Sequence, residues 1–512
     1  MPRTCAPPAL PWLLPVPDLL LTLLRNPFFD HLLVVTGVLL VVLSILLVLK
    51  VRSTPQSAVA WILFIVLLPY IGVPVFLALG FRKQRRGVAP SRFTLGPRDL
   101  AAELAARLPA GAADAARLFR STGAAPVMMG NRLAIHRDDA EAHEELNRMI
   151  DGAAQEINAL FYILRNDAAG RAFVDRLTAR ARQGVTVRLG LDRLGTLKRP
   201  RKELAALVAA GGEVRYVSPF LHLRNAGNLN LRNHRKLVLT DAFHDPAQPA
   251  AVWAGGRNIG NSYLLQPPGG RVDLSFTATG PIAAAFGEVF ASDWLVAGGN
   301  DLRAAAARAV TEAEPAAGTT DEDAGPPPAA ADAAEGAALQ LVNAGPDEPK
   351  DGLHDGLVAA IHRARDRVWI ATPYFIPTEP LALALANAAR SGRDVRILVP
   401  GRSDQWTADF ARGAFLRDVE RAGARIQRFE RGMMHAKLVV IDGWALVGSA
   451  NFDIRSMRLN FESMVAVYDA ATTTALADWF LAASDGAAEP LPPSRLHRRI
   501  LERLFRLGAP ML

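Results

Sequence analysis

The chain contains two related stretches, Asn233-His-Arg-Lys-Leu-Val-Leu-Thr-Asp241 and Met434-His-Ala-Lys-Leu-Val-Val-Ile-Asp442. Both follow the pattern His-x-Lys-x-x-x-x-Asp, and the two histidines lie 201 positions apart. Because the chain has ten histidines and only seven lysines, its composition predicts about 0.14 His-x-Lys pairs by chance. Two copies of the longer pattern therefore indicate an internal duplication.

The spacing within each copy favours phosphate chemistry. In a β-strand, residues two positions apart share a face, so His and Lys would lie side by side while the Leu-Val run continues into a core. A Gly-x-x-Asn pattern follows each copy, at Gly255 to Asn258 and at Gly448 to Asn451. These residues would bring a backbone amide and a carboxamide to a phosphate, and the lysine would neutralise its charge without a metal.

The regions around the two copies predict an α/β fold. Strand-like runs at 157–163 and 185–191 flank a helical pattern at 170–182. The same order recurs at 368–370, 379–391 and 395–399. This alternation predicts two similar α/β domains with mostly parallel sheets flanked by helices.

The N-terminal part is strongly apolar. Residues 31–49 and 58–79 are nearly uncharged and are each about the length that crosses a bilayer, which predicts a transmembrane helical hairpin. A cleaved signal peptide is the alternative for the first segment. Basic residues are more numerous after the second segment, between Arg82 and Arg98, than between the two, so the long C-terminal part is expected in the cytoplasm.

The C-terminal residues 495–507 place Leu496, Ile500, Leu501, Leu504 and Phe505 at helical spacing against five arginines and His497. Such a helix either lies on anionic lipid or docks on the catalytic domain.

The predicted organisation of the chain has seven parts. They are an interfacial segment (1–30), the hairpin (31–80), a basic and amphipathic connector (81–129), the first domain (130–300), an Ala/Pro-rich acidic linker (301–337), the second domain (338–490) and a basic amphipathic helix (491–512).

Composition limits the function further. The 512 residues include one cysteine, Cys5, which excludes an intramolecular disulfide and any site built on several cysteines. The net charge of +8 suggests an anionic partner, either nucleic acid or an anionic lipid surface.

At these motifs the sequence resembles the phospholipase D superfamily, and more closely its bacterial cardiolipin synthases. The resemblance rests on the following stretches: Ala60-Trp-Ile62 with Pro69, Gly130-Asn131, Asn230-Leu-Arg-Asn-His-Arg-Lys236, Thr372-Pro-Tyr-Phe-Ile-Pro377, Gly448-Ser-Ala-Asn-Phe-Asp-Ile-Arg-Ser456 and Leu459-Asn-Phe-Glu462. The sequence departs from the family at Gly270-Arg-Val-Asp-Leu-Ser275, which keeps only the aspartate, and in an enlarged turn after Asp241. These departures bear on acceptor specificity more than on phosphoryl transfer.

The resemblance implies one active site between the two domains. One histidine would attack the phosphodiester, and the other would act as general acid and base. We assign His234 as nucleophile and His435 as acid/base, although the pseudo-symmetric sequence does not separate the two roles. The remaining implied roles are phosphate binding by Lys236, Lys437, Asn258, Asn451 and Ser449, imidazole orientation by Asp273 and Glu462, and a structural role within the motif for Asp241 and Asp442. No cofactor and no metal are implied.

The implied function is a membrane-bound phosphatidyltransferase that joins two phosphatidylglycerol molecules into cardiolipin and releases glycerol, through a phosphohistidine. Its expected partners are anionic phospholipids and the bacterial inner membrane, with the catalytic domains on the cytoplasmic side and no nucleic acid. The alternatives are a phospholipase D hydrolase, a transphosphatidylase with another acceptor, a nuclease or phosphodiesterase, and a non-catalytic scaffold. The sequence gives no oligomeric state.

Overall fold

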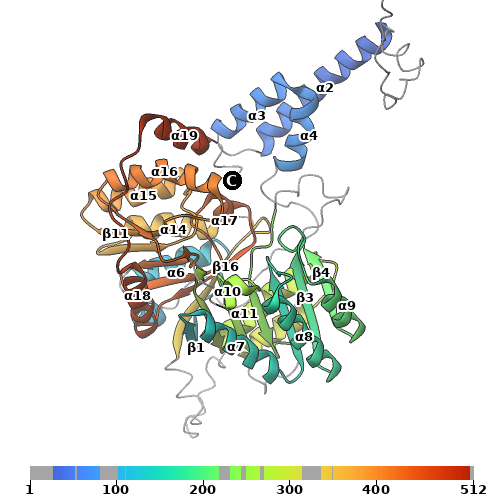
Figure 1. Cartoon of the computed structure of the whole chain (residues 1–512), viewed down its shortest axis with the longest axis vertical. Helices are drawn as coiled ribbons and strands as arrows, with labels where there is room; N and C mark the ends of the chain where they lie inside the picture. The colour runs from blue at the N-terminus through green and yellow to red at the C-terminus, as the bar shows by residue number, and fades with distance from the viewer. Residues whose placement is uncertain are drawn as a thin grey trace, which may run out of the picture. The chain divides into compact units, whose positions relative to one another are not determined.

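The structure is a computed structural model that describes residues 27–51, 55–80, 102–109, 111–217, 231–243, 250–265, 270–313, 336–348 and 350–507 (Figure 1). The chain divides into two compact units: among the described residues, the first contains 27–51 and 55–80, and the second contains those from 102 onward. Most of the predicted interfacial segment, the whole of the basic stretch at 82–98, and most of the acidic linker lie outside the described residues.

The predicted hairpin is three helices: α2 (Pro27–Val51), α3 (Pro55–Leu67) and α4 (Pro69–Leu79). Leu68, with φ −137°, interrupts the second apolar run, because the residue before a proline is disfavoured in a helical conformation. Ile65, Val73 and Phe76 are buried between these helices. Among the described residues, no helix combines the length and hydropathy required to cross a membrane.

The second unit is built on one sheet of fourteen strands. The strands of its first half are β1 (Met128–His136), β2 (Glu156–Phe161), β3 (Thr186–Asp192), β4 (Glu213–Val217), β5 (Leu237–Thr240), β6 (Ala251–Gly255) and β8 (Ser275–Thr279). The strands of its second half are β9 (Ala337–Ala344), β10 (Arg367–Ala371), β11 (Asp394–Pro400), β12 (Arg425–Phe429), β14 (Leu438–Ile441), β15 (Trp444–Gly448) and β16 (Glu462–Val467).

The duplicated motif corresponds to a duplicated topology. From its outer edge inward, the first half has the order β4-β3-β2-β5-β6-β8-β1, and the second half has the same order as β12-β11-β10-β14-β15-β16-β9. The antiparallel pair β1 and β9 joins the halves at the centre. Each motif lies at the start of an equivalent strand, β5 or β14.

The α/β class is confirmed, but the prediction of mostly parallel sheets is wrong. Only β2-β3-β4 and β10-β11-β12 pair in parallel, and the other neighbours in the large sheet are antiparallel. The motif strands continue into hairpins, and a short turn such as Asp442-Gly443 can reverse the chain but cannot make a parallel crossover.

Helices cover both faces of this sheet (Figure 1). One face carries α11 (Pro281–Val296) and α18 (Ala470–Ser484), whose buried residues form one core shared by both halves. The opposite face carries α7 (Asp139–Gly152) and α8 (Ala168–Arg182) in the first half, and α14 (Gly352–Arg363), α15 (Glu379–Arg390) and α16 (Trp406–Arg421) in the second. The shorter helices are α5 (Ala102–Arg107), α6 (Ala112–Ser121), α9 (Arg201–Ala209), α10 (Asn261–Leu264), α12 (Arg303–Ala313) and α17 (Ile454–Arg458).

The C-terminal helix α19 (Leu496–Leu507) packs against α16. The ring of Phe505 stacks on Phe410 at 5.4 Å, and Arg506 Nη1 lies 2.6 Å from Asp418. Of the two predicted arrangements, the structure therefore has the docked one. Leu496, Ile500 and Leu504 remain exposed.

Candidate active site

The two motifs meet across the halves of the chain. His234 N donates to the carbonyl of Phe461 in the second half (2.9 Å). His435 N donates to the carbonyl of Val272 in the first half (2.8 Å), beside a small parallel pair formed by β7 (Arg271–Val272) and β13 (Met433–Met434). Each motif is thus fixed to the half to which it does not belong.

Each histidine also faces a carboxylate from the opposite half. Nδ1 of His234 lies 2.9 Å from Oε1 of Glu462, and Nδ1 of His435 lies 2.6 Å from Oδ2 of Asp273. Both carboxylates are buried. A carboxylate at Nδ1 favours the tautomer that carries its proton there, which leaves a lone pair on Nε2.

Burial sets the charge of the two imidazoles. It lowers the pKa of His234 to about 4, against the opposing effect of Glu462 and with the help of Lys236. It lowers the pKa of His435 to about 3, where Lys437 adds to the effect and Asp273 opposes it. Both imidazoles are therefore neutral at pH 7, as a nucleophile requires.

The two motif lysines lie beside the histidines. Nζ of Lys236 donates to the carbonyl of His234 (2.5 Å), and Nζ of Lys437 donates to the carbonyl of His435. Burial lowers the pKa of Lys236 to about 7 and that of Lys437 to about 8, although Glu462 and Asp273 favour the charged forms. A phosphate oxyanion between them would favour the protonated form of both ammonium groups.

The motif aspartates lie at the other ends of their strands. Asp241 accepts hydrogen bonds at 2.7 to 3.0 Å from three consecutive backbone N–H groups, those of Ala154, Gln155 and Glu156. Asp442 accepts in the same way, at 2.9 to 3.0 Å, from the backbone N–H groups of Arg365, Asp366 and Arg367. Both aspartates have positive φ, 54° and 48°. Each aspartate therefore fastens its hairpin turn to the start of a neighbouring strand, away from the histidine of its own motif.

The predicted phosphate-binding residues differ between the halves. Oδ1 of Asn258 accepts from Ile163 N (3.0 Å), whereas Oδ1 of Asn451 is buried with no hydrogen-bond partner among the described residues. Ser449 Oγ donates to Oε2 of Glu462 (2.6 Å). The serine therefore supports the carboxylate that faces His234, a contact that its predicted phosphate role does not include.

Two tyrosines that were not predicted pack against the two motif histidines. The ring of Tyr162 lies edge-on to His234, with 4.9 Å between centroids, and that of Tyr263 lies edge-on to His435 at 5.6 Å. Tyr162 directly follows β2, and Tyr263 lies in α10. The available signal for Tyr162 was its place at a strand end in the sheet that carries the motif.

Tyr263 contacts an arginine that belongs to an ion pair. The Arg271 guanidinium lies over the Tyr263 ring, 4.6 Å from its centroid, and Arg271 Nη2 lies 2.8 Å from Oδ2 of Asp404. The hydroxyl of Tyr374 also donates to Asp404. Tyr374, from the predicted Thr372-Pro-Tyr374 stretch, is thereby held near the second motif.

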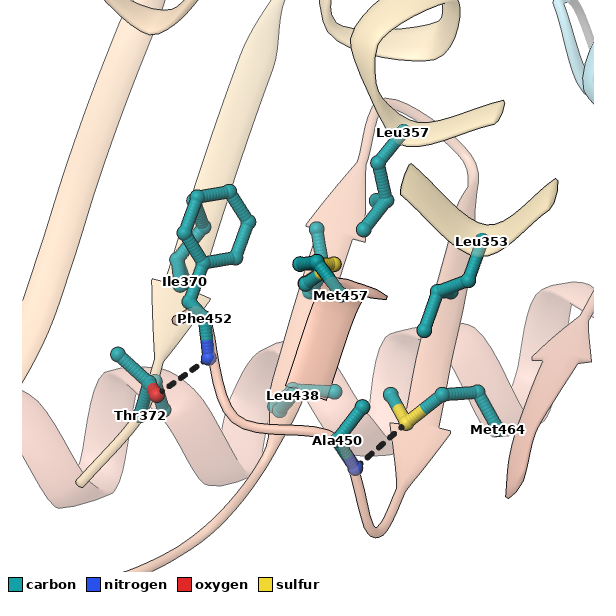
Figure 2. Close-up of a pocket in the computed structure, with 11 residues that line it drawn as sticks. Leu353, Leu357, Ile370, Thr372, Leu438, Ala450, Phe452, Met457 and Met464 are labelled. Carbon is teal, nitrogen blue, oxygen red and sulfur yellow. Dashed lines mark hydrogen bonds between the residues drawn. The ribbon is translucent and has the colours of Figure 1, made fainter. Parts of the chain in front are cut away.

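A small pocket lies in the core beside Ala450 and Phe452, which belong to the loop after β15 (Figure 2). Figure 2 shows Leu353, Leu357 and Met464 facing it, with the N–H of Phe452 bonded to Thr372 Oγ1. Its volume of about 10 Å³ would hold one water molecule, and its lining is mostly apolar. It is a packing void, too small for a substrate.

Comparison with known proteins places this geometry in a family. Residues 357–483 match the family described as cardiolipin synthase, PLD-like domain. The chain is 30% identical over 477 residues to cardiolipin synthase A of Pseudomonas syringae pv. syringae, covering 90% of this chain and 93% of that protein. It is 32% identical over 456 residues to cardiolipin synthase A of Pseudomonas aeruginosa, covering 86% and 87%.

The fold has a counterpart of known structure. Phosphatidylserine synthase from Haemophilus influenzae Rd KW20 superposes with a TM-score of 0.57 at 15% identity, covering 78% of this chain and 100% of that one. The comparisons confirm the resemblance inferred from the motifs. This chain therefore belongs to the cardiolipin synthase family of the phospholipase D superfamily and is an enzyme of that family.

Proposed function

We propose that the enzyme transfers a phosphatidyl group from one phosphatidylglycerol to a second one, forming cardiolipin and releasing glycerol. The observation that carries this proposal is the pair of neutral histidines, each facing a carboxylate from the opposite half and each next to a buried lysine. This arrangement has one nucleophile, one acid/base and two cations for a phosphodiester.

In the first step, Nε2 of His234 attacks the phosphorus atom and the bond from phosphorus to the glycerol oxygen breaks. His435 donates a proton to that oxygen, and the negative charge of the bound phosphodiester favours its protonated form. In the second step, a hydroxyl of the second phosphatidylglycerol gives its proton to His435 and attacks phosphorus. The phosphorus to nitrogen bond then breaks and returns His234 to its neutral state.

The immediate surroundings of the two imidazoles support His234 as the nucleophile. Nδ1 of His435 has Lys437 Nζ at 2.7 Å in addition to its carboxylate, and a nearby cation withdraws electron density from the ring. Nδ1 of His234 faces both oxygens of Glu462, at 2.9 and 3.0 Å. Although the contact of His435 with its carboxylate is shorter, the lysine at its Nδ1 helps to hold its pKa at about 3, below the value of about 4 for His234. His234 is therefore the more basic imidazole and the better nucleophile.

We further propose that helices α2, α3 and α4 attach the enzyme to the bacterial inner membrane, with the catalytic halves on the cytoplasmic side. These helices expose large apolar side chains, which a bilayer would cover. Those on α2 include Leu32, Val35, Val38, Leu39, Val42, Leu43, Leu46 and Leu49. The arginines between Arg82 and Arg98 would then lie near the anionic leaflet. Protease protection in vesicles of known orientation tests the predicted side.

The experiment for the reaction uses purified full-length enzyme and vesicles of labelled phosphatidylglycerol. The wild type should form one glycerol for each cardiolipin. His362→Ala, which replaces an exposed histidine on α14, should form both products at the wild-type rate. His234→Ala and His435→Ala should each form neither product. Phosphatidate in place of cardiolipin would instead identify a hydrolase, and a different phosphatidyl product with added phosphatidylethanolamine would identify another acceptor.

A further inference from the structure

A second polar cavity lies at the edge of the second half, away from the motifs. It is about 350 Å³ in volume and is enclosed by the ends of β11 and β12, by α16, and by the segment that leads into α19. This volume is within the range of small-molecule sites. None of the residues that line it belongs to the motifs or to their carboxylate partners.

The lining of this cavity is unbalanced in charge. It contains five arginines but only two carboxylates, Asp409 and Glu502. The five are Arg402, Arg412, Arg417, Arg428 and Arg498. Cationic side chains gathered around a partly enclosed space focus a positive potential on it, which favours an anionic ligand.

Arg412 is the most buried of the five, with 7% of its surface exposed. Its Nη2 donates to the carbonyl of Gly401 (3.0 Å) and lies 2.9 Å from Asp409. Its Nη1 is buried and has no hydrogen-bond partner among the described residues, and the same holds for Nε of Arg428. Such buried donors are costly when they lack an acceptor.

The charge on Arg412 is also incompletely compensated. Burial, together with Arg428 and Arg498, lowers its pKa, while Asp409 and Glu430 oppose this effect. Arg428 Nη1 has Glu430 as a partner at 2.9 Å, so the excess positive charge lies mainly on the other arginines. An oxyanion in the cavity would add negative charge beside these guanidinium groups.

The C-terminal helix completes the cavity. Glu502 of α19 accepts from Arg417 Nε and from Arg498 Nε, each at 3.2 Å, and Arg417 Nη1 donates to the carbonyl of Pro492 (3.0 Å). Glu502 thus holds two of the arginines in place. Apolar residues, among them Trp406, Phe410 and Leu491, line the rest, and Trp406 is 66% exposed.

From this geometry we propose that the cavity is a second anion site, for a phosphate group carried on a body with apolar parts. Arginine guanidinium groups suit phosphate because they donate in pairs to its oxygens. The apolar walls suit an attached acyl or glycerol portion. The phosphate could belong to the headgroup of an anionic phospholipid or to a free phosphate ester, and both present the same oxyanion to the arginines.

The test uses the full-length enzyme in detergent and follows Trp406 fluorescence as ligand is added. The probes are inorganic phosphate, glycerol phosphate and short-chain phosphatidate. Trp406→Phe identifies the part of the signal that comes from this cavity. Arg402→Ala removes an exposed arginine of the lining, Arg428→Gln removes one that carries an unpaired donor, and Arg182→Ala on α8 is the matched control.

We expect saturable binding that weakens about tenfold or more in Arg402→Ala and Arg428→Gln, with Arg182→Ala equal to the wild type. Equal binding of glycerol phosphate and phosphatidate, both tighter than that of inorganic phosphate, would assign the site to free phosphate esters. Binding of phosphatidate alone would assign it to lipid headgroups. Absence of saturable binding in the wild type, or unchanged affinity in Arg402→Ala with its fold intact by circular dichroism, would overturn the proposal.

Discussion

Nδ1 of His435 lies 2.6 Å from Oδ2 of Asp273, a carboxylate that the other half of the chain contributes. The equivalent contact, from His234 to Glu462, runs in the opposite direction between the halves. Neither half therefore contains a complete histidine and carboxylate pair. The active site depends on the continuous sheet that holds the two halves together.

Asp273→Asn should lower cardiolipin formation by about 10²-fold or more, because an amide no longer fixes the Nδ1 tautomer or stabilises the imidazolium. Although burial opposes it, Lys437 and His435 lower the pKa of Asp273 to about 2, so the wild-type group is a carboxylate. The turnover number measured with saturating phosphatidylglycerol checks this effect. Turnover within threefold of the wild type would show that the contact has no catalytic role.

The enzyme should lose kcat/KM as the pH rises above about 7 to 8. Burial lowers the pKa of Lys236 to about 7 and that of Lys437 to about 8 in the free enzyme. The protonated lysines carry the charge that binds the phosphodiester, so their deprotonation removes it. A pH profile between 5 and 10, at constant ionic strength, measures the decline. A flat profile up to pH 9.5 would contradict these assignments.

Asp442→Ala should destabilise the fold by about 1 to 3 kcal/mol, because three backbone N–H groups lose their acceptor. Asp241→Ala should behave in the same way, since its three contacts are equivalent. Denaturant unfolding of the purified variants measures the loss. If activity per folded molecule fell as far as in His435→Ala, the aspartates would belong to the chemistry and not to the turns.

Arg235→Met should destabilise the fold by about 3 to 5 kcal/mol, because it leaves the buried carboxylate of Asp293 without its cation. Arg235 Nη1 lies 2.7 Å from Asp293 on α11, and both side chains are almost completely buried. The double variant Arg235→Met/Asp293→Leu should be less destabilised than the single variant. Additive losses in denaturant unfolding would show that the two residues are not coupled.

The sequence predicted the repeated unit well, because duplication and periodicity are local properties. The expected strand at 185–191 is β3 (Thr186–Asp192), and the expected helix at 379–391 is α15 (Glu379–Arg390). The strand that follows each motif also lies where alternation placed it, at Leu237–Thr240 and Leu438–Ile441.

The order of the strands and the pairing of the site residues could not be predicted as well from the sequence, because both depend on contacts between distant residues. The sheet is mixed because several consecutive strands are joined by hairpins. The periodicity of apolar residues identifies a strand but does not show whether a hairpin or a parallel crossover connects it to the next one. Asp273 and Glu462 were singled out as orienting groups, but the sequence did not assign either one to a particular histidine. Tyr162 and Tyr263 were not predicted. The place of Tyr162 at a strand end is a weak local signal, and the edge-on packing of both rings on the imidazoles depends on contacts between distant residues.

The most direct test of the account is a rapid-quench experiment with labelled phosphatidylglycerol, followed by peptide mapping of the acid-labile adduct. His435 assists both steps, so His435→Gln should slow both. We predict that a single, slow release of glycerol still occurs in this variant, whereas the acceptor hydroxyl has no base, so that a phosphatidyl group accumulates on the peptide that contains His234. His234→Gln should accumulate none. An adduct on His435 in the His234→Gln variant, or no adduct in either variant while cardiolipin still forms, would contradict the account.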